Sequence, residues 1–326
     1  MIDTTEAQAS APRAIAFVLL ERYCAARGYR LTAGDAHGHA GCVESPAGRR
    51  WYFKGTRFDL NTLGAAEIAN DKAYAAAFLS RAGIPVPTGH LVFSSEIRDG
   101  GPLPAAVRDF AGEQAFPLFV KPNCGREGRD VMRVDTIHTL QNALHLLANR
   151  TDQMLVQEEV RGTELRVIVL DGEVLCAVER RPPRVTGDGV RSLAEIIAAH
   201  PRAQATDPRL DFELTRQGLR LETVPAAGQV VTLLPVANLS AGGTARIVTT
   251  SLSEDLAALA RLAAKTLALR YAAVDFILPE RPRADAAAVV LEVNAAPGLG
   301  NLHRQGPEEA QAVEAVYERV FAATFG

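Results

Sequence analysis

The sequence predicts an α+β protein with more than one lobe, and three observations support this. Strand-like and helical stretches are mixed along the chain, with no internal repeat. Tight turns join neighbouring strand-like runs, as Asp171-Gly172 joins 165–170 to 173–178, and such turns produce antiparallel hairpins. The 326 residues are 48% hydrophobic, which supplies enough apolar material for two lobes. A purely doubly wound parallel sheet is therefore disfavoured.

The N-terminal part of the chain contains two predicted helices and a hairpin. Residues 1–10 are small and polar and are expected to fray. Capping and turn signals predict a helix over 14–27, strands over 41–45 and 51–55 joined by Pro46-Ala47-Gly48, and a helix over 63–81 that ends before a glycine and two prolines.

The rest of the chain alternates strands with amphipathic helices. The clearest helix covers 136–149, where apolar residues are three and four apart. Ser192 is predicted to cap the short helix after it. Ser251 and Glu254 would form a capping box for a helix running to Leu269. The predicted strands are 91–93, 116–122, 154–157, 165–170, 173–178, 274–277 and 289–294.

Charge and cysteine usage disfavour several classes of protein. The formal net charge is −3 and the pI is near 6.2, so neither nucleic acid nor an anionic membrane surface is expected as the main partner. The four cysteines are far apart, without a zinc pattern, and are expected to be reduced thiols in a cytoplasmic protein. Asp3 and Glu6 precede any apolar run, which argues against a signal peptide. No apolar stretch is long enough to span a bilayer.

Three oxygen-bearing side chains stand in two apolar runs near the C-terminus: Asp275, Glu292 and Asn294. A carboxylate is rarely left in a core without a partner. Glu292 and Asn294 are two residues apart and would share one face of a strand. Hard oxygens on paired strands suit Mg²⁺ bound to nucleotide phosphates. A salt-bridged strand pair that ends in a turn is an equal alternative.

Two lysines are candidates for phosphate binding. Lys121 ends a predicted buried strand, and the glycines of the following loop, 123–129, would let backbone N–H groups approach an anion. Lys72 follows Asp71 in a predicted helix. Taken alone, each lysine is more readily interpreted as part of a solvated surface segment. Only the two lysines together favour the interpretation as a phosphate-binding site. The loop matches neither a Walker A sequence nor GxGxxG.

Weaker signals suggest other parts of a binding site. The acidic turn after 154–157 would present backbone groups to adenine and a carboxylate to ribose, although acidic turns are common. The Gly-rich segment 238–244 is either a flexible loop or a set of backbone donors for a carboxylate or acyl phosphate. Arg166 lies among apolar strand residues, so it either pairs with a buried carboxylate or faces a cleft. The arginine-rich segment 179–184 forms either the acceptor side of a cleft or a solvated loop.

In this order, the pieces resemble the ATP-grasp superfamily of carboxylate–amine ligases. The resemblance rests on "DK" at 71–72 with "GIPVP", on "VKP" at 120–122, on "GTE" at 162–164, and on Asp275 with "EVN" at 292–294. The strings "VTGDGVRSLAEII", "TRQGLRLETVPAAG", "NLSAGG" and "EVNAAPGL" are most similar to the ATP-grasp region of the cyanophycin synthetases. The similarity covers about residues 50 to 300. A Mur-ligase-like module is not expected.

The resemblance implies an ATP-grasp fold, in which two α+β lobes grip ATP beside a small N-terminal α/β region. The expected divisions are 1–67 for that region, 68–153 for the central lobe, and 154–326 for the C-terminal lobe with the Mg/ATP site. Residues 1–67 would shape either the acceptor site or an oligomer interface, and a homodimer stays open.

The resemblance also implies roles for the matching residues. The lysines would hold the ATP phosphates, the loop 123–130 would close over them, the acidic turn would line the adenine pocket, and Glu164 would hold the ribose. The residues implied in nucleotide binding are Lys72, Lys121, Gly125, Arg126, Gly128, Gln157, Glu158, Glu159, Val160 and Glu164. Asp275, Glu292 and Asn294 would bind Mg²⁺, or Mn²⁺ in its place. The residues implied in holding the substrate carboxylate and the acyl phosphate are Arg166, Ser240, Gly242 and Gly243.

The implied reaction joins an amino-acid or peptide carboxylate to an amine through an acyl phosphate, with release of ADP. Small-molecule amino acids or peptides are the expected partners, and one bond type is expected to be made. The alternatives are a nucleotide-binding accessory subunit without catalysis and a kinase that stops at phosphoryl transfer.

Two positions depart from the family pattern. Cys124 stands where an acidic residue is expected, and Asp130 where a glycine is expected. A carboxylate near phosphates is unfavourable unless it faces away or pairs with Arg126 or Arg129. No histidine is paired with Cys124 by motif, so a catalytic thiol is disfavoured.

Overall fold

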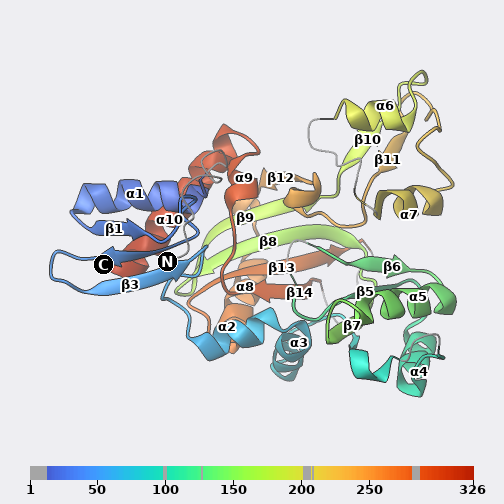
Figure 1. Ribbon diagram of the computed structural model, residues 1–326, viewed down its shortest axis with the longest axis horizontal. Helices are drawn as coiled ribbons and strands as arrows, with labels where there is room; N and C mark the ends of the chain where they lie inside the picture. The colour runs from blue at the N-terminus through green and yellow to red at the C-terminus, as the bar shows by residue number, and fades with distance from the viewer. Residues whose placement is uncertain (1–12, 98–100, 126–127, 201–206, 208, 281–286) are drawn as a thin grey trace.

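The computed structural model describes residues 13–97, 101–125, 128–200, 207, 209–280 and 287–326 (Figure 1). Within these residues the strands form four sheets, and neighbouring strands of each sheet run antiparallel. The mixture of helices with antiparallel sheets confirms the α+β class. The predicted fraying of residues 1–10 lies outside the described residues. None of the described helices is both long and apolar enough to cross a membrane.

The N-terminal region packs onto the last helix of the chain. It consists of helix α1 (Ile15–Arg27) and a sheet of β1 (Arg30–Ala33), β2 (Ala40–Glu44) and β3 (Arg50–Lys54). In helix α10 (Pro307–Phe325), the Phe321 ring centroid lies 5.5 Å from that of Tyr23 and 5.3 Å from that of Phe58. These rings join N-terminal and C-terminal elements in one core, which also covers one face of the largest sheet.

The largest sheet has five strands in the order β12-β9-β8-β13-β14. The strands are β8 (Gly162–Leu170), β9 (Glu173–Arg181), β12 (Thr244–Ile247), β13 (Tyr271–Pro279) and β14 (Val289–Asn294). Successive residues of a strand point to opposite faces, so β8 gives Ile168 to the first core and Val167 and Val169 to a second core. The second core lies under α2 (Leu63–Asn70), α3 (Lys72–Arg81) and α8 (Glu254–Thr266). Short helical segments also occur: α9 (Gly300–His303), η2 (Leu239–Ala241) and η3 (Thr249–Ser251).

A four-stranded sheet forms the next lobe, with the order β4-β7-β5-β6. Its elements are β4 (Gly89–Phe93), η1 (Ser94–Glu96), α4 (Ala105–Gln114), β5 (Leu118–Pro122), β6 (Met132–Val134), α5 (Ile137–Ala148) and β7 (Gln153–Glu158). Leu140, Leu144 and Leu147 of α5 are fully buried against the strands, as their spacing predicts.

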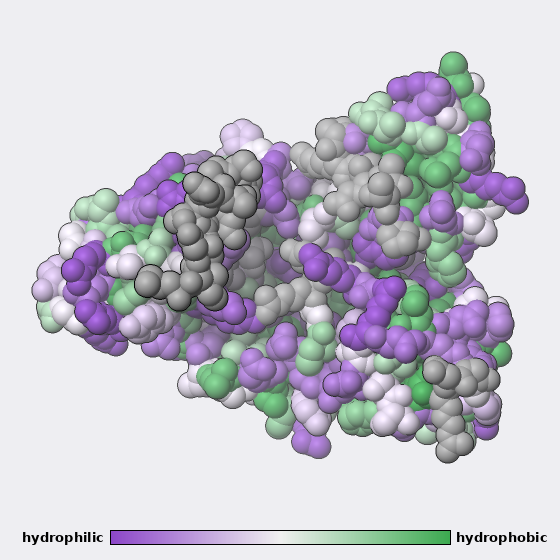
Figure 2. Space-filling model, in the orientation of Figure 1, coloured by the Kyte–Doolittle hydropathy of each residue, from purple (hydrophilic) through white to green (hydrophobic). Residues whose placement is uncertain are grey.

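A small lobe projects from the end of β9 (Figure 1). It contains β10 (Arg184–Thr186) paired with β11 (Val230–Thr232), together with α6 (Leu193–Ala198) and α7 (Arg209–Arg216). Its apolar residues form a separate core. In the space-filling view a notch separates this lobe, at the upper right, from the four-stranded lobe below it, and many residues beside the notch are hydrophilic (Figure 2).

Several elements differ in detail from the sequence predictions. The helix predicted over 63–81 is interrupted at Asp71, whose extended backbone ends α2 and whose Oδ1 accepts from the Tyr74 N–H at 2.9 Å to begin α3. The cap of α8 is Ser253, because Ser251 belongs to η3, so the capping box predicted at Ser251 is wrong. Strand β1 was not predicted, since none of its residues is buried and it has no clear apolar alternation.

The sheet pairing shows which elements belong to the four-stranded lobe. Strand β7 belongs to the four-stranded sheet, and α3 packs under the five-stranded sheet. Two hydrogen bonds close the four-stranded lobe at its base: the Glu158 N–H donates to the Thr88 carbonyl at 3.0 Å, and the Thr88 N–H donates to Glu158 Oε1 at 2.8 Å. The four-stranded sheet and its helices therefore lie between about residues 88 and 158, and the division into 1–67, 68–153 and 154–326 stays a prediction.

Asn61 joins the start of β13 to the residues after β14. Its Nδ2 donates to the carbonyls of Tyr271 (2.6 Å) and Ala295 (2.7 Å), and its Oδ1 accepts from the N–H groups of Arg270 (2.8 Å) and Tyr271 (3.1 Å). Asn61→Ala is expected to lower the free energy of unfolding by about 2 kcal/mol, because it leaves partly buried backbone groups unpaired. Chemical denaturation checks this, with the exposed Asn142→Ala as control. Equal stability of the two variants would contradict it.

Candidate functional site

The two predicted phosphate-binding lysines come from different lobes and lie at one junction. Lys72 is the first residue of α3, and its Nζ donates to the carbonyls of Asn123 (3.4 Å) and Gly125 (3.2 Å). Lys121 is on β5, is 7% exposed, and donates to Gln157 Oε1 of β7 at 2.7 Å. Lys72 Nζ also lies 3.7 Å from Glu292 Oε2 of β14, which links the lysines to the predicted oxygen ligands.

The environment of Lys121 disfavours its positive charge. Burial and, to a smaller extent, the nearby charge of Lys72 lower the pKa of the Lys121 ammonium to about 8, while Glu292 and Glu164 oppose the shift. Its hydrogen-bond partner among the described residues, Gln157, is a neutral amide, so this buried cation is suited to receive an anionic ligand.

The predicted oxygen cluster forms on the last two strands. Asp275 of β13 is paired in register with Glu292 of β14. Asn294 lies on the same face as Glu292, as the two-residue spacing predicts, and its Nδ2 donates to Glu292 Oε1 (3.1 Å) and, weakly, to Asp275 Oδ2 (3.4 Å). Asp275 is completely buried, whereas the Glu292 side chain is 27% exposed.

Two arginines hold the buried carboxylates. Arg166 donates to both oxygens of Asp275, from Nε at 2.7 Å and from Nη2 at 2.6 Å, so the carboxylate-paired alternative for Arg166 is the one observed. Arg180 Nη2 lies 3.0 Å from Asp275 Oδ2 and also donates to Glu164. The set contains two positive and two negative groups within three adjacent strands, as buried charges require.

The pKa shifts in this set follow from burial and pairing. Burial alone would raise the pKa of the Asp275 carboxyl, but Arg166 and Arg180 hold it well below its usual range. Burial alone would lower the pKa of Arg166, but Asp275 raises it. The pKa of Glu164 is raised, because burial and the charge of Asp275 outweigh the attraction of Arg180.

The three predicted ligands differ in how readily they could coordinate a divalent cation. Glu292 supplies a partly exposed carboxylate, and Asn294 supplies an amide oxygen once its amide turns to face the cation. Both oxygens of Asp275 already accept from guanidinium groups, so Asp275 has less acceptor capacity left for a cation than Glu292 has. Among the described residues, no three His, Cys, Asp or Glu side chains are grouped so as to hold a metal.

The loop after β5 is fixed at both of its described glycines. The Gly125 carbonyl accepts from Lys72, and the Gly128 carbonyl accepts from Arg209 Nη1 of α7 at 2.6 Å. Gly128 has a φ of +66°, and a Cβ there would lie 2.5 Å from Asn238 Oδ1, so a side chain at this position would strain the backbone and displace Asn238. Arg126 lies outside the described residues.

The two departures from the family pattern have local explanations. Asp130 pairs with Arg150 at 2.5 Å, a partner that was not considered from the sequence. Cys124 is exposed as a residue, but its sulfur is partly covered. This partial burial and the charge of Asp71 raise the pKa of the thiol, which disfavours a nucleophilic thiolate.

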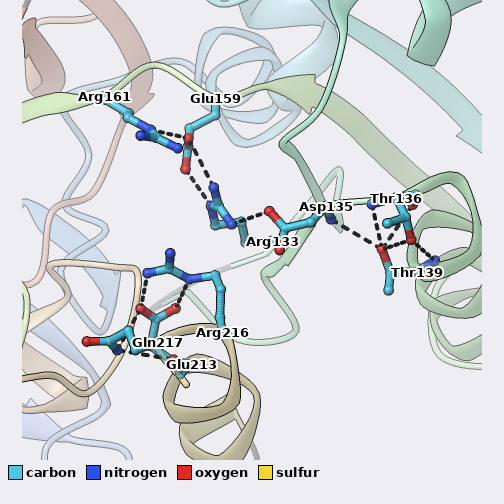
Figure 3. A network of polar contacts seen from close by, with 9 residues as sticks. All are labelled: Arg133, Asp135, Thr136, Thr139, Glu159, Arg161, Glu213, Arg216 and Gln217. Atoms are coloured by element: carbon cyan, nitrogen blue, oxygen red, sulfur yellow. Dashed lines mark hydrogen bonds and ion pairs between the residues drawn. The ribbon is translucent and has the colours of Figure 1, made fainter. Parts of the chain in front are cut away.

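In the acidic turn after β7, the carboxylates of Glu158 and Glu159 are bound to other protein groups, so only the backbone of the turn remains for a ligand in the described residues. Glu158 caps the Thr88 N–H. Glu159 accepts from Arg133 Nε at 2.7 Å and from Arg161 Nε at 2.5 Å (Figure 3). Arg133 also pairs with Asp135, whose N–H donates to Thr139 Oγ1 in the first turn of α5 (Figure 3). Val160 is half-buried between this network and β8.

The segment Ser240–Gly243 lies next to the end of β9. Gly242 has a φ of +93°, and a Cβ on Gly243 would lie 2.9 Å from the Arg181 carbonyl. Direct contacts link Lys72, Gly125, Glu292, Asn294, Asp275 and Arg166, and Arg180 joins Glu164 to Asp275. Lys121 and Gln157 form a separate pair. The Gly243 N–H donates to the Asn238 carbonyl at 3.2 Å, and Asn238 Oδ1 lies against Gly128 of the loop after β5.

Two residues of this junction were missed by sequence reasoning. Arg180 was treated as part of an arginine-rich segment that is either a solvated loop or an acceptor surface, but it is 5% exposed in β9. Its signal was the alternation Cys176, Val178, Arg180, which places all three on one face. The second is Asn123, which is fully buried and gave no signal beyond its place after Lys121.

Comparison with known proteins agrees with this architecture. A protein-family model described as "RimK-like ATP-grasp domain" matches residues 69–188 and 236–313. This chain belongs to the RimK-like ATP-grasp family. The gap between the two matched parts covers most of the small lobe, including Arg209, and the matched parts contain the lysines, the oxygen cluster and the two arginines that hold it.

Curated relatives in this family include much longer proteins. The cyanophycin synthetase of Geminocystis herdmanii is 32% identical over 252 residues, which cover 72% of this chain and 28% of that protein. The glutathione biosynthesis bifunctional protein GshAB of Pasteurella multocida is 28% identical over 230 residues, 65% of this chain and 29% of that protein. The chain thus spans less than a third of the length of these relatives.

Solved structures support the fold. A bifunctional glutathione synthetase from Pasteurella multocida superposes with a TM-score of 0.57 at 21% identity and covers 94% of this chain and 44% of that chain. A D-alanine–D-alanine ligase from Bacillus anthracis has a TM-score of 0.52 at 17% identity and covers 81% of this chain and 68% of that chain. The predicted ATP-grasp fold is confirmed.

Nucleotide binding is expected to weaken at alkaline pH because of Lys121. Phosphates raise the pKa of a lysine they contact, so above about pH 8 binding must first add a proton to the free protein. The affinity for ADP should therefore be flat below this pH and fall about tenfold between pH 7 and 9. Calorimetry in buffers of different ionisation enthalpy measures the proton uptake. Lys121→Gln should abolish the uptake and the exposed Lys265→Gln should keep it; no uptake by the unaltered protein would refute the assignment.

Arg180 is expected to be needed for the stability of the five-stranded sheet. Arg180→Met keeps the bulk but leaves Glu164 and Asp275 with one guanidinium, which is expected to lower the free energy of unfolding by about 3 kcal/mol. Adding Glu164→Gln should restore part of the loss. The neighbouring Arg181→Met, whose side chain is 63% exposed, serves as control. A loss equal to that of the control in thermal denaturation would speak against the buried set.

Proposed function

We propose that this protein is an ATP-dependent carboxylate–amine ligase that forms an amide bond through an acyl phosphate and releases ADP and phosphate. The observation that carries the proposal is the junction of Lys72, Lys121 and Glu292, where two cations from different lobes approach a partly exposed carboxylate. Phosphoryl transfer requires positioned charge and little covalent chemistry from the protein, and this junction supplies positioned charge.

In this proposal the two lobes divide the nucleotide between them. Lys72, Lys121 and the loop with Gly125, Arg126 and Gly128 hold the phosphates. The residues from Gln157 to Val160 line the adenine through their backbone, since the side chains of Glu158 and Glu159 are engaged elsewhere. Glu164 would hold ribose while it is paired with Arg180.

A bound Mg²⁺, or Mn²⁺, supplies the charge that neutralises the phosphates during transfer. Glu292 and Asn294 fit as its ligands, and Asp275 would join them if Arg166 turned toward the substrate. Arg166, together with Ser240, Gly242 and Gly243, would then hold the substrate carboxylate and the acyl phosphate.

The reaction has two steps. A carboxylate oxygen of the first substrate attacks the γ-phosphorus of ATP, and the bond from that phosphorus to the bridging oxygen breaks to release ADP. The amine nitrogen of the second substrate then attacks the acyl carbon, the carbon–oxygen bond to phosphate breaks, and the nitrogen loses a proton. The substrates proposed are amino acids or short peptides in the cytoplasm, and a homodimer that uses residues 1–67 is one arrangement of the proposal.

The test is consumption of ATP with Mg²⁺ over a matrix of amino acids and short peptides, with ADP, AMP and product mass measured. ADP that appears only when a carboxylate and an amine are both present, with a product one water lighter than their sum, is the expected result. ADP with a phosphorylated product and no requirement for an amine would indicate a kinase. AMP would overturn the acyl-phosphate route, and nucleotide binding without turnover under any pair would favour an accessory subunit.

Glu292→Gln is expected to lower kcat at least a hundredfold, because it removes the partly exposed charged ligand next to Lys72. The exposed Glu113→Gln on α4 is the matched control and should keep full activity. Circular dichroism and the melting temperature should show that both variants are folded. Normal turnover by Glu292→Gln would remove Glu292 from the metal site.

A further inference from the structure

We infer that Asn123 is a positioning residue that sets Lys72 of one lobe against Lys121 of the other, and this inference rests on the proposed phosphate role of the two lysines. Asn123 follows β5 directly and is 0% exposed. Every polar group of the residue has a partner, and the partners belong to α3 and to β7.

Asn123 completes the first turn of α3 from a distant part of the chain. The first N–H groups of a helix have no partner within the helix. In α3 the Lys72 N–H donates to the Asn123 carbonyl at 3.3 Å, and the Ala73 N–H donates to Asn123 Oδ1 at 2.9 Å. The Tyr74 N–H donates to Asp71, the local cap. Two of the three caps on this helix therefore come from a residue 50 positions later in the sequence.

The same residue extends the pairing of β5 with β7. The Asn123 N–H donates to the Gln153 carbonyl at 3.0 Å, one step beyond the last paired residues of the strands, and Asn123 Nδ2 donates to Gln153 Oε1 at 2.9 Å. The backbone of Asn123 is thereby fixed relative to the four-stranded sheet, and its carbonyl is the acceptor for Lys72 Nζ at 3.4 Å.

The consequence is a fixed distance between the two lysines. Lys121 is two residues before Asn123 on the same strand, and Lys72 is the first residue of the helix that Asn123 caps. Helix α3 itself packs in the core of the five-stranded sheet through Ala75 and Leu79. Asn123 thus connects the two sheets where the lysines meet, and α3 lies beside the four-stranded lobe (Figure 1).

The test compares ligands with and without phosphates. Asn123→Leu removes both side-chain hydrogen bonds with little change in volume. The affinities for ADP and for adenosine are measured by displacement of a fluorescent ATP analogue. We expect about a tenfold weaker affinity for ADP, a difference of about 1.4 kcal/mol, and less than a twofold change for adenosine, because only the phosphates contact the lysines. An equal loss for both ligands, or no loss for either, overturns the inference.

A second pair of variants keeps the test valid if Asn123→Leu does not fold. Gln153→Leu removes the acceptor of Asn123 Nδ2, whereas Gln153→Glu keeps an acceptor oxygen at that place. The first should show the ADP-specific loss in weaker form and the second should restore the affinity. Equal ADP affinity in both variants overturns the inference.

The outcomes separate this inference from the proposed function. If the unaltered protein binds ADP but forms no amide, the ligase proposal fails while the ADP-specific effect of Asn123→Leu still decides the positioning role. If amide is formed and Asn123→Leu binds ADP normally, only the positioning role fails. If the unaltered protein does not bind ADP, both fail.

Discussion

The buried carboxylate of Asp275 is the constraint on which the rest of the structure depends. An isolated buried carboxylate would cost too much free energy, so Asp275 requires the positive charges of Arg166 on the adjacent strand β8 and of Arg180 on the next strand, β9. Arg180 also contacts Glu164, so its positive charge is shared between the carboxylates of Glu164 and Asp275. The register of β9, β8 and β13 is therefore fixed by charge at this end, as it is fixed by apolar residues at the other.

The face of the sheet that carries these charges explains where a site can form. Ile168, Val178 and Ala273 belong to the core under α10, and two residues further toward the other end the same face carries Arg166, Arg180 and Asp275. The sheet thus changes from an apolar to a charged face within one alternation. The charged end lies where Glu292 approaches Lys72, and the second lobe adds Lys121 there.

The sequence predicted the parts of this arrangement that local pattern determines. The strands that carry Lys121, Arg166, Asp275 and Glu292 were predicted from their apolar runs, and the shared face of Glu292 and Asn294 follows from the period of a strand. The pairing partners could not be predicted, because they depend on which strands are neighbours. Arg180 is the clearest case: its charge suggested a solvated loop, and only the register opposite Glu164 shows why it is buried.

Long-range caps are the second kind of contact that local pattern does not reveal. Asp71 caps α3 from the adjacent position, a signal that the sequence contains, yet Asn123 makes an equivalent contact from another sheet. The small lobe reaches the site in the same way. It lies mostly outside the family match, but Arg209 of α7 holds the Gly128 carbonyl in the loop after β5. A change in this lobe can therefore act on the loop after β5 without altering either lysine, so a lobe that lies mostly outside the family match is coupled to the matched part.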